Sequence, residues 1–173
     1  MASLLVAAAV SLGYALCGVP NIELMTITIF VSGFLLGVGF GGLIGGLSAA
    51  LYSMFNPMGA ALPPLLAAQI VGFAVVGVFG GLVGPGVGRM RSRRMAVVCA
   101  AVLGFTLTLF YDLITNVGAF FVITGTREAT DFLKFVIAGI MFMGVHILWN
   151  TGLFAVVLKP MLNVLSRYRG ELF

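Results

Sequence analysis

Residues 24–55 read LMTITIFVSGFLLGVGFGGLIGGLSAALYSMF, an apolar run that contains no charged side chain. Apolar runs of about 18 residues or more are typical of transmembrane helices. As one helix this run would be about 48 Å long, whereas the hydrocarbon core of a bilayer is about 30 Å thick. The glycines at Gly37, Gly39, Gly41 and Gly42 offer a place to break it. We therefore predict two membrane helices, at 24–37 and 38–55.

Four further apolar segments flank this run, at 2–19, 63–85, 95–117 and 132–159. The whole chain is 61% hydrophobic and only 8% charged, whereas soluble domains carry about 25% charged residues. Its 24 glycines suit helices that approach closely in lipid. These features predict an all-α membrane protein in which residues 1–173 form one domain, a compact bundle of six transmembrane helices.

The basic residues predict how this bundle is oriented. They gather at Arg89–Arg94 and Lys159–Arg169, each beside an apolar segment, so the net charge of +4 points to membrane orientation and not to nucleic acid. Six spans place both clusters, and both the N- and C-termini, in the cytoplasm. The loops at 20–23, 56–64 and 124–131 then face outward.

Familiar catalytic and cofactor motifs are absent or lack their structural context. Gly37–Gly42 fits G-x-G-x-x-G, but that pattern indicates dinucleotide binding only between a strand and a helix. We interpret it as a turn with close packing, and we interpret the similar stretches FGGLIG (40–45) and FGGLVG (79–84) as two tight helix contacts. The sequence has no P-loop, no metal-ligand cluster and a single histidine. We expect no enzyme activity, no metal and no cofactor.

Polar residues inside the apolar segments are the candidate binding residues. Ionisable groups at membrane depth are costly and usually functional. Asp112 and Asn116 share one helix face at i, i+4 spacing, and so do His146 and Asn150. The candidate substrate-binding residues are Asn21, Glu23, Asn56, Asp112, Asn116, His146, Trp149 and Asn150. The alternative is that these groups only hydrogen-bond neighbouring helices.

Three stretches resemble the S components of energy-coupling factor (ECF) transporters: PNIELMT (20–26), FNPMG (55–59) and YDLITN (111–116). S components are small six-helix membrane proteins that capture vitamins and related micronutrients. The resemblance implies an outward pocket closed by the loops after spans one, three and five. It also implies docking on a transmembrane coupling subunit that carries two ATPases, so that the chain serves uptake and not catalysis. The resemblance further implies a multi-pass protein of a prokaryotic cell (inner) membrane.

In that family, docking uses small residues on the first helix. Here two small-residue stripes offer a coupling interface, one formed by Ala7, Ser11 and Ala15 and the other by Ala9 and Gly13. The N-terminus lacks the histidine segment of the cobalt and nickel members, which argues against a metal cargo. Trp149, with Tyr52 or Tyr111, predicts an aromatic wall that suits a small, ring-containing polar substrate. An autonomous carrier or channel without an ATPase partner and a structural membrane subunit stay open as alternatives.

Overall fold

The computed structural model describes residues 1–124 and 128–172, with the side chains of 169–172 left aside, and the described residues form helices and loops without a strand. Residues 125–127 of the loop predicted at 124–131, and the side chain of Arg169, therefore lie outside the described part. The helices are α1 (Ala2–Ala15), α2 (Met25–Leu36), α3 (Val38–Met54), α4 (Pro63–Arg89), α5 (Arg93–Ile123), α6 (Ala129–Leu153), the π-helical turn η1 (Phe154–Leu158) and α7 (Lys159–Leu172).

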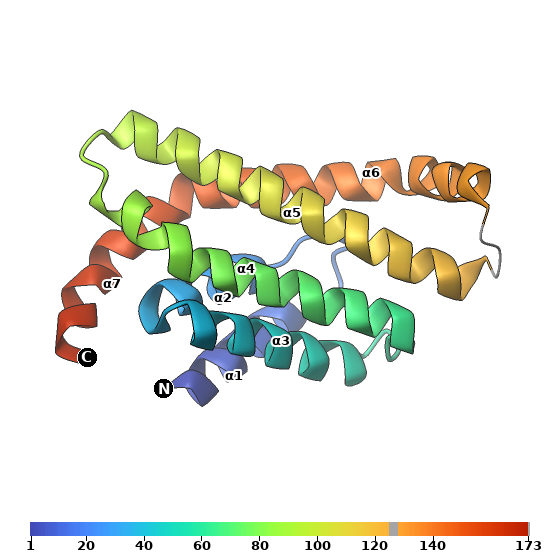
Figure 1. The fold of residues 1–173 in the computed structure, drawn as a ribbon, viewed down its shortest axis with the longest axis horizontal. Helices are drawn as coiled ribbons and strands as arrows, with labels where there is room; N and C mark the ends of the chain where they lie inside the picture. The colour runs from blue at the N-terminus through green and yellow to red at the C-terminus, as the bar shows by residue number, and fades with distance from the viewer. Residues whose placement is uncertain (125–127, 173) are drawn as a thin grey trace.

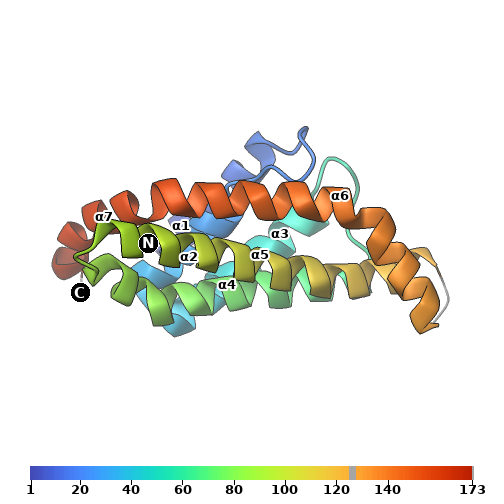
Figure 2. The ribbon, with the colours of Figure 1, turned by 90° about the horizontal axis from the view of Figure 1, so that it is seen from above.

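Three helices in the described part are long and apolar enough to cross a membrane: α4, α5, and the continuous helix from Ala129 to Tyr168 that contains α6, η1 and most of α7. The other helices have 14, 12 and 17 residues, which corresponds to about 21, 18 and 26 Å against a hydrocarbon core of about 30 Å. The long helices run side by side, and α1, α2 and α3 pack along one side of them (Figures 1 and 2).

The predicted break in the long apolar run is confirmed, and it falls at Gly37. This residue separates α2 from α3 and has φ 87°, in the left-handed region that favours glycine. The other glycines of the cluster continue into α3. Elsewhere the helices extend beyond the predicted segments, because α5 continues to Ile123 and α4 passes through Pro85 to reach Arg89. The first helix instead ends early, at Ala15.

Helix α2 forms the centre of the molecule. Eleven of its twelve residues are buried, including Thr28 and Ser32. The hydroxyl of Thr28 donates to the Leu24 carbonyl oxygen at 2.7 Å and that of Ser32 to the Thr28 carbonyl oxygen at 2.8 Å, so neither is unsatisfied. Because α2 is surrounded by protein, it does not need the length of a lipid-exposed helix.

Glycines let α2, α3 and α4 pack with their backbones in direct contact. A Cβ atom at Gly41 would collide with the carbonyl oxygen of Gly77, and one at Gly80 would collide with that of Phe30. The two similar glycine stretches thus both lie in close helix contacts, although they do not pack symmetrically against each other. This seam fixes the angle at which the short helices meet α4.

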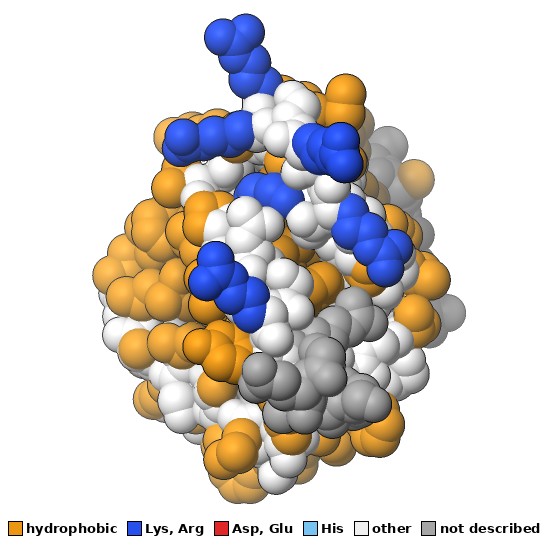
Figure 3. Space-filling view, turned by 90° about the vertical axis from the view of Figure 1, so that its left-hand side faces the viewer, with side chains coloured by type: hydrophobic (Ala, Val, Ile, Leu, Met, Phe, Trp, Pro, Cys, Tyr) orange, Lys and Arg blue, Asp and Glu red, His pale blue; other side chains and the backbone are white. Residues whose placement is uncertain are grey.

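Both basic clusters lie at the same end of the bundle. Arg91, Arg93 and Lys159 surround one groove there, and the Lys159 ammonium group donates to the Gly88 carbonyl oxygen. Figure 3 looks onto this end and shows the Lys and Arg side chains gathered on it, with no acidic side chain among those that the structure describes. The loop between α3 and α4 and the end of α5 lie at the opposite end (Figure 1). The bundle therefore has one basic end.

Candidate functional site

A cavity of about 410 Å³ is lined by the loop that joins α1 to α2 and by residues of the helices α1 to α6. Its volume falls in the usual range of small-molecule sites, about 300–1,000 Å³. One wall is the 16–23 loop, and the others come from α3, α4, α5 and α6. The cavity reaches Asp112 on α5 and His146 on the continuous helix from Ala129 to Tyr168, and both residues lie far from the ends of these helices.

The structure brings six of the eight candidate binding residues to this cavity: Asn21, Glu23, Asn56, Asp112, Asn116 and His146. Trp149 and Asn150 do not line it. Their side chains instead donate hydrogen bonds to Glu23, so they hold a residue of the cavity wall without lining the cavity themselves. Whether the six lining residues bind a substrate stays a prediction.

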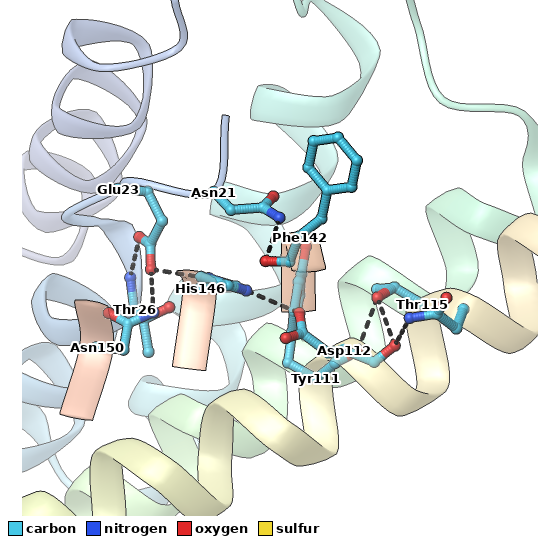
Figure 4. Close-up of polar contacts among 10 residues, drawn as sticks. Asn21, Glu23, Thr26, Tyr111, Asp112, Thr115, Phe142, His146 and Asn150 are labelled. Atoms are coloured by element: carbon cyan, nitrogen blue, oxygen red, sulfur yellow. Dashed lines mark hydrogen bonds and ion pairs between the residues drawn. The ribbon is translucent and has the colours of Figure 1, made fainter. Parts of the chain in front are cut away.

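Three ionisable side chains form a buried chain across the cavity wall. His146 Nδ1 lies 2.7 Å from Asp112 Oδ1, and His146 Nε2 lies 3.5 Å from Glu23 Oε1. Figure 4 shows the imidazole ring held between the two carboxylates. His146 and Asp112 are only 5% and 7% exposed. The ring therefore connects α5 to the 16–23 loop through α6, and these groups require each other because isolated buried charges are costly.

Glu23 is the best-satisfied member of this chain. The Thr26 backbone N–H donates to Glu23 Oε2 at 2.7 Å, and the Asn150 amide donates to Glu23 Oε1 at 2.9 Å. The Trp149 indole N–H donates to the Glu23 backbone carbonyl oxygen at 2.7 Å. The expected aromatic wall therefore does not include Trp149 in this structure. Trp149 and Asn150 position Glu23 and the loop that carries it.

The asparagines of the cavity are each held by a hydrogen bond to a backbone group. Asn21, with φ 59°, donates through its amide to the Phe142 carbonyl oxygen at 2.6 Å and so ties the loop to α6. Asn56 accepts from the Met58 backbone N–H at 2.9 Å, and Asn116 donates to the Asp112 carbonyl oxygen at 2.7 Å. Each of these amides retains donor or acceptor capacity for a ligand in the cavity.

One carboxylate oxygen in the wall is buried without a partner. Asp112 Oδ1 faces His146, but Asp112 Oδ2 makes no hydrogen bond. A buried acceptor left unsatisfied costs about 1–3 kcal/mol, and more when it is charged. Because Asp112 lines the cavity, a rotation of its carboxylate would bring this oxygen to a donor on a molecule inside it.

Further lining residues were missed or only partly anticipated from the sequence. Gln69 and Phe73 enter from α4, and Phe142 enters from α6. Gln69 is the only glutamine of the chain and lies inside an apolar segment, so its polarity was the signal that could have identified it. Tyr52 and Tyr111, both anticipated as alternatives, line the cavity, and the Tyr111 ring packs 4.5 Å from the Phe73 ring, centre to centre.

The two small-residue stripes on α1 differ in exposure. Ala9 and Gly13 are buried, and Gly13 faces the Tyr52 ring and the Met25 sulfur. Ala7, Ser11 and Ala15 are exposed. Ala9 and Gly13 are thus occupied by contacts within this chain, which leaves the exposed stripe as the candidate coupling interface.

No metal centre accompanies these features: among the described residues, no group of three or more His, Cys, Asp or Glu side chains is arranged to hold a metal ion. No protein-family model, curated protein or solved structure matches the chain. The function of the cavity is therefore inferred from its own residues.

Proposed function

We propose that the chain captures a small, vitamin-like micronutrient at the outer face of a prokaryotic cell membrane and serves its uptake as an S component of an ECF-type transporter. In this proposal the six membrane spans are α1 to α5 and the continuous helix from Ala129 to Tyr168, and both termini are cytoplasmic. The 410 Å³ cavity is the substrate site. The resemblance of the three sequence stretches suggests the transporter class, and the cavity suggests where the substrate binds.

The observation that carries the proposal is the position of two ionisable side chains, Asp112 and His146, deep inside apolar helices. Asp112 and His146 lie near the middle of long apolar helices, where an ionisable side chain is costly. Both residues also line the cavity, and Asp112 Oδ2 is buried without a hydrogen-bond partner, which together favour a role in binding.

The direction of uptake follows from the basic end. Lys and Arg are enriched on the cytoplasmic side of membrane proteins, so the end that carries Arg91, Arg93 and Lys159 would face the cytoplasm. The cavity is lined by Asn56, beyond the end of α3, and by Ala119 and Gly139, in the halves of α5 and α6 remote from that end. A substrate would therefore enter from outside.

Coupling to ATP hydrolysis would use the exposed stripe on α1. Ala7, Ser11 and Ala15 lie on one face at i, i+4 spacing, and small residues allow a partner helix to approach closely. In this proposal the partner is a transmembrane coupling subunit that carries two ATPase subunits. The lipid bilayer surrounds the remaining apolar faces.

Co-purification and uptake test this proposal directly. The chain, solubilised from its native membranes in mild detergent, should retain the coupling subunit and both ATPase subunits. Ser11→Leu should release them because its bulk holds the partner helix away. Thr106→Leu is the matched control, since Thr106 is also exposed but lies on α5 and donates only to its own helix. Retention by Ser11→Leu would place the coupling interface elsewhere.

Transport assays on the purified protein distinguish the proposed S component from an autonomous carrier or a channel. Uptake of the compound that co-purifies with the chain should require the ATPase subunits and ATP. Uptake into vesicles that contain this chain alone would identify an autonomous carrier, and an ion current would identify a channel.

A further inference from the structure

The charges that line the cavity do not balance. Glu23, Asp112 and His146 are the only acidic or basic side chains among the described lining residues, and no Lys or Arg joins them. If both carboxylates are ionised, they leave a net negative charge even beside a fully charged imidazole. An unbalanced charge among buried side chains is unfavourable, so the cavity is suited to a positively charged ligand.

The hydrogen bonds show which carboxylate would meet that ligand. Both oxygens of Glu23 already accept, from Thr26 and from Asn150. Asp112 uses Oδ1 for His146 and leaves Oδ2 free, although the residue is only 7% exposed. A carboxylate oxygen only accepts hydrogen bonds, so the missing partner must be a donor.

The remaining walls suit a planar ring. Tyr52, Phe73, Tyr111 and Phe142 line the same cavity, and the Tyr111 ring also meets the His146 ring edge to face at 5.9 Å. Aromatic faces attract cations as well as other rings. Such walls therefore favour a ligand that combines an aromatic ring with a positive charge.

We propose that the substrate is a small ring compound with a protonated nitrogen of the amine or amidine class, which donates to Asp112 Oδ2. This inference rests on the proposed function, since it names the substrate class of the same cavity. Glu23 and His146 then position Asp112 and the 16–23 loop, while the aromatic side chains hold the ring.

Three planar probes of similar size test the charge preference: benzamidinium, benzamide and benzoate. Cys17 lines the cavity as a free thiol, so a bound probe should slow its alkylation by N-ethylmaleimide in a Cys99→Ser background. Benzamidinium should protect at a concentration about tenfold lower than benzamide, because hydrogen bonds to charged groups are stronger than neutral ones. Benzoate should not protect.

Two matched variants test whether Asp112 causes the preference for benzamidinium over benzamide. Asp112→Asn should abolish the preference for benzamidinium over benzamide. Asp131→Asn removes the same charge from a carboxylate that pairs with Lys134 near the start of α6, and should preserve that preference. A preference that survives in Asp112→Asn would overturn the assignment to Asp112.

The unmodified pocket tests the charge preference even if Asp112→Asn does not fold. Equal or better protection by benzoate or benzamide would overturn the cationic substrate while leaving the cavity as a small-molecule site. Protection by none of the three probes would count against the cavity itself, and so against the proposed function as well.

Discussion

Asn150 provides the sharpest test of how the cavity wall is held. Its amide donates to Glu23 Oε1 at 2.9 Å, across 127 positions of sequence. Asn150→Leu keeps a similar side-chain volume but removes the donor. Glu23 Oε1 would then retain only the 3.5 Å contact to His146. We expect the 16–23 loop to open more often as a result.

The magnitude follows from the kind of bond that is lost. A hydrogen bond to a charged group contributes about 1.5–3 kcal/mol. If that stabilisation holds the loop closed, its opening equilibrium should rise about tenfold to a hundredfold. Hydrogen exchange measured by mass spectrometry on the peptide that covers residues 16–26 should accelerate by the same factor. Peptides from α4 should exchange as in the parent protein.

Asn163→Leu is the matched control for this measurement. Asn163 lies on the same continuous helix but is exposed at the basic end of the bundle. The same chemical change there should leave exchange in residues 16–26 unaltered. Equal exchange of the loop in the parent and Asn150→Leu would refute the inference that Asn150 holds the loop through Glu23.

Three further predictions test other parts of the molecule. Trp149→Phe keeps an aromatic ring but loses the N–H that donates to the Glu23 carbonyl oxygen, so the same loop should exchange about fivefold faster, for about 1 kcal/mol; unchanged exchange would contradict this. Gly41→Ala should lower the free energy of unfolding by about 1–3 kcal/mol because its Cβ meets the Gly77 backbone. Gly46→Ala has room for the Cβ and should raise the free energy of unfolding by about 0.5–1 kcal/mol. Equal melting temperatures of the two variants would refute the close packing of α2, α3 and α4 at these glycines. Cysteines placed at Ser92 and Glu128 should label from opposite sides of the membrane, and labelling from the same side would rule out six spans.

Much of the helical framework could be predicted from the sequence, because apolar length and glycine are local signals. The break at Gly37 follows from the length of the run and from the backbone freedom of glycine. The grouping of Asp112 and His146 among the candidate binding residues was anticipated from the i, i+4 spacing on their helices. Their direct 2.7 Å contact was not, since spacing sets a face but not a depth.

Contacts between segments that are distant along the chain could not be predicted from the sequence. Trp149 and Asn150 were expected inside the pocket, but both turn to Glu23, more than 120 positions away. The burial of α2 was also missed, since an apolar helix that faces lipid and one that faces protein have the same composition. The exposure of Ser11 against the burial of Gly13 likewise depends on which face meets α3.

The most direct test of the cavity as a substrate site is the small-molecule content of the purified protein. Gly139 lines the cavity with only the Asn116 side-chain oxygen near its absent Cβ, at 3.7 Å, so Gly139→Leu should fill the site. Gly152 lies on the same helix in open space, which makes Gly152→Leu the matched control. Mass spectrometry should find one compound released in equimolar amount by the parent and Gly152→Leu, and none by Gly139→Leu. Equal release by all three proteins, or no compound from the parent, would contradict a substrate site in this cavity.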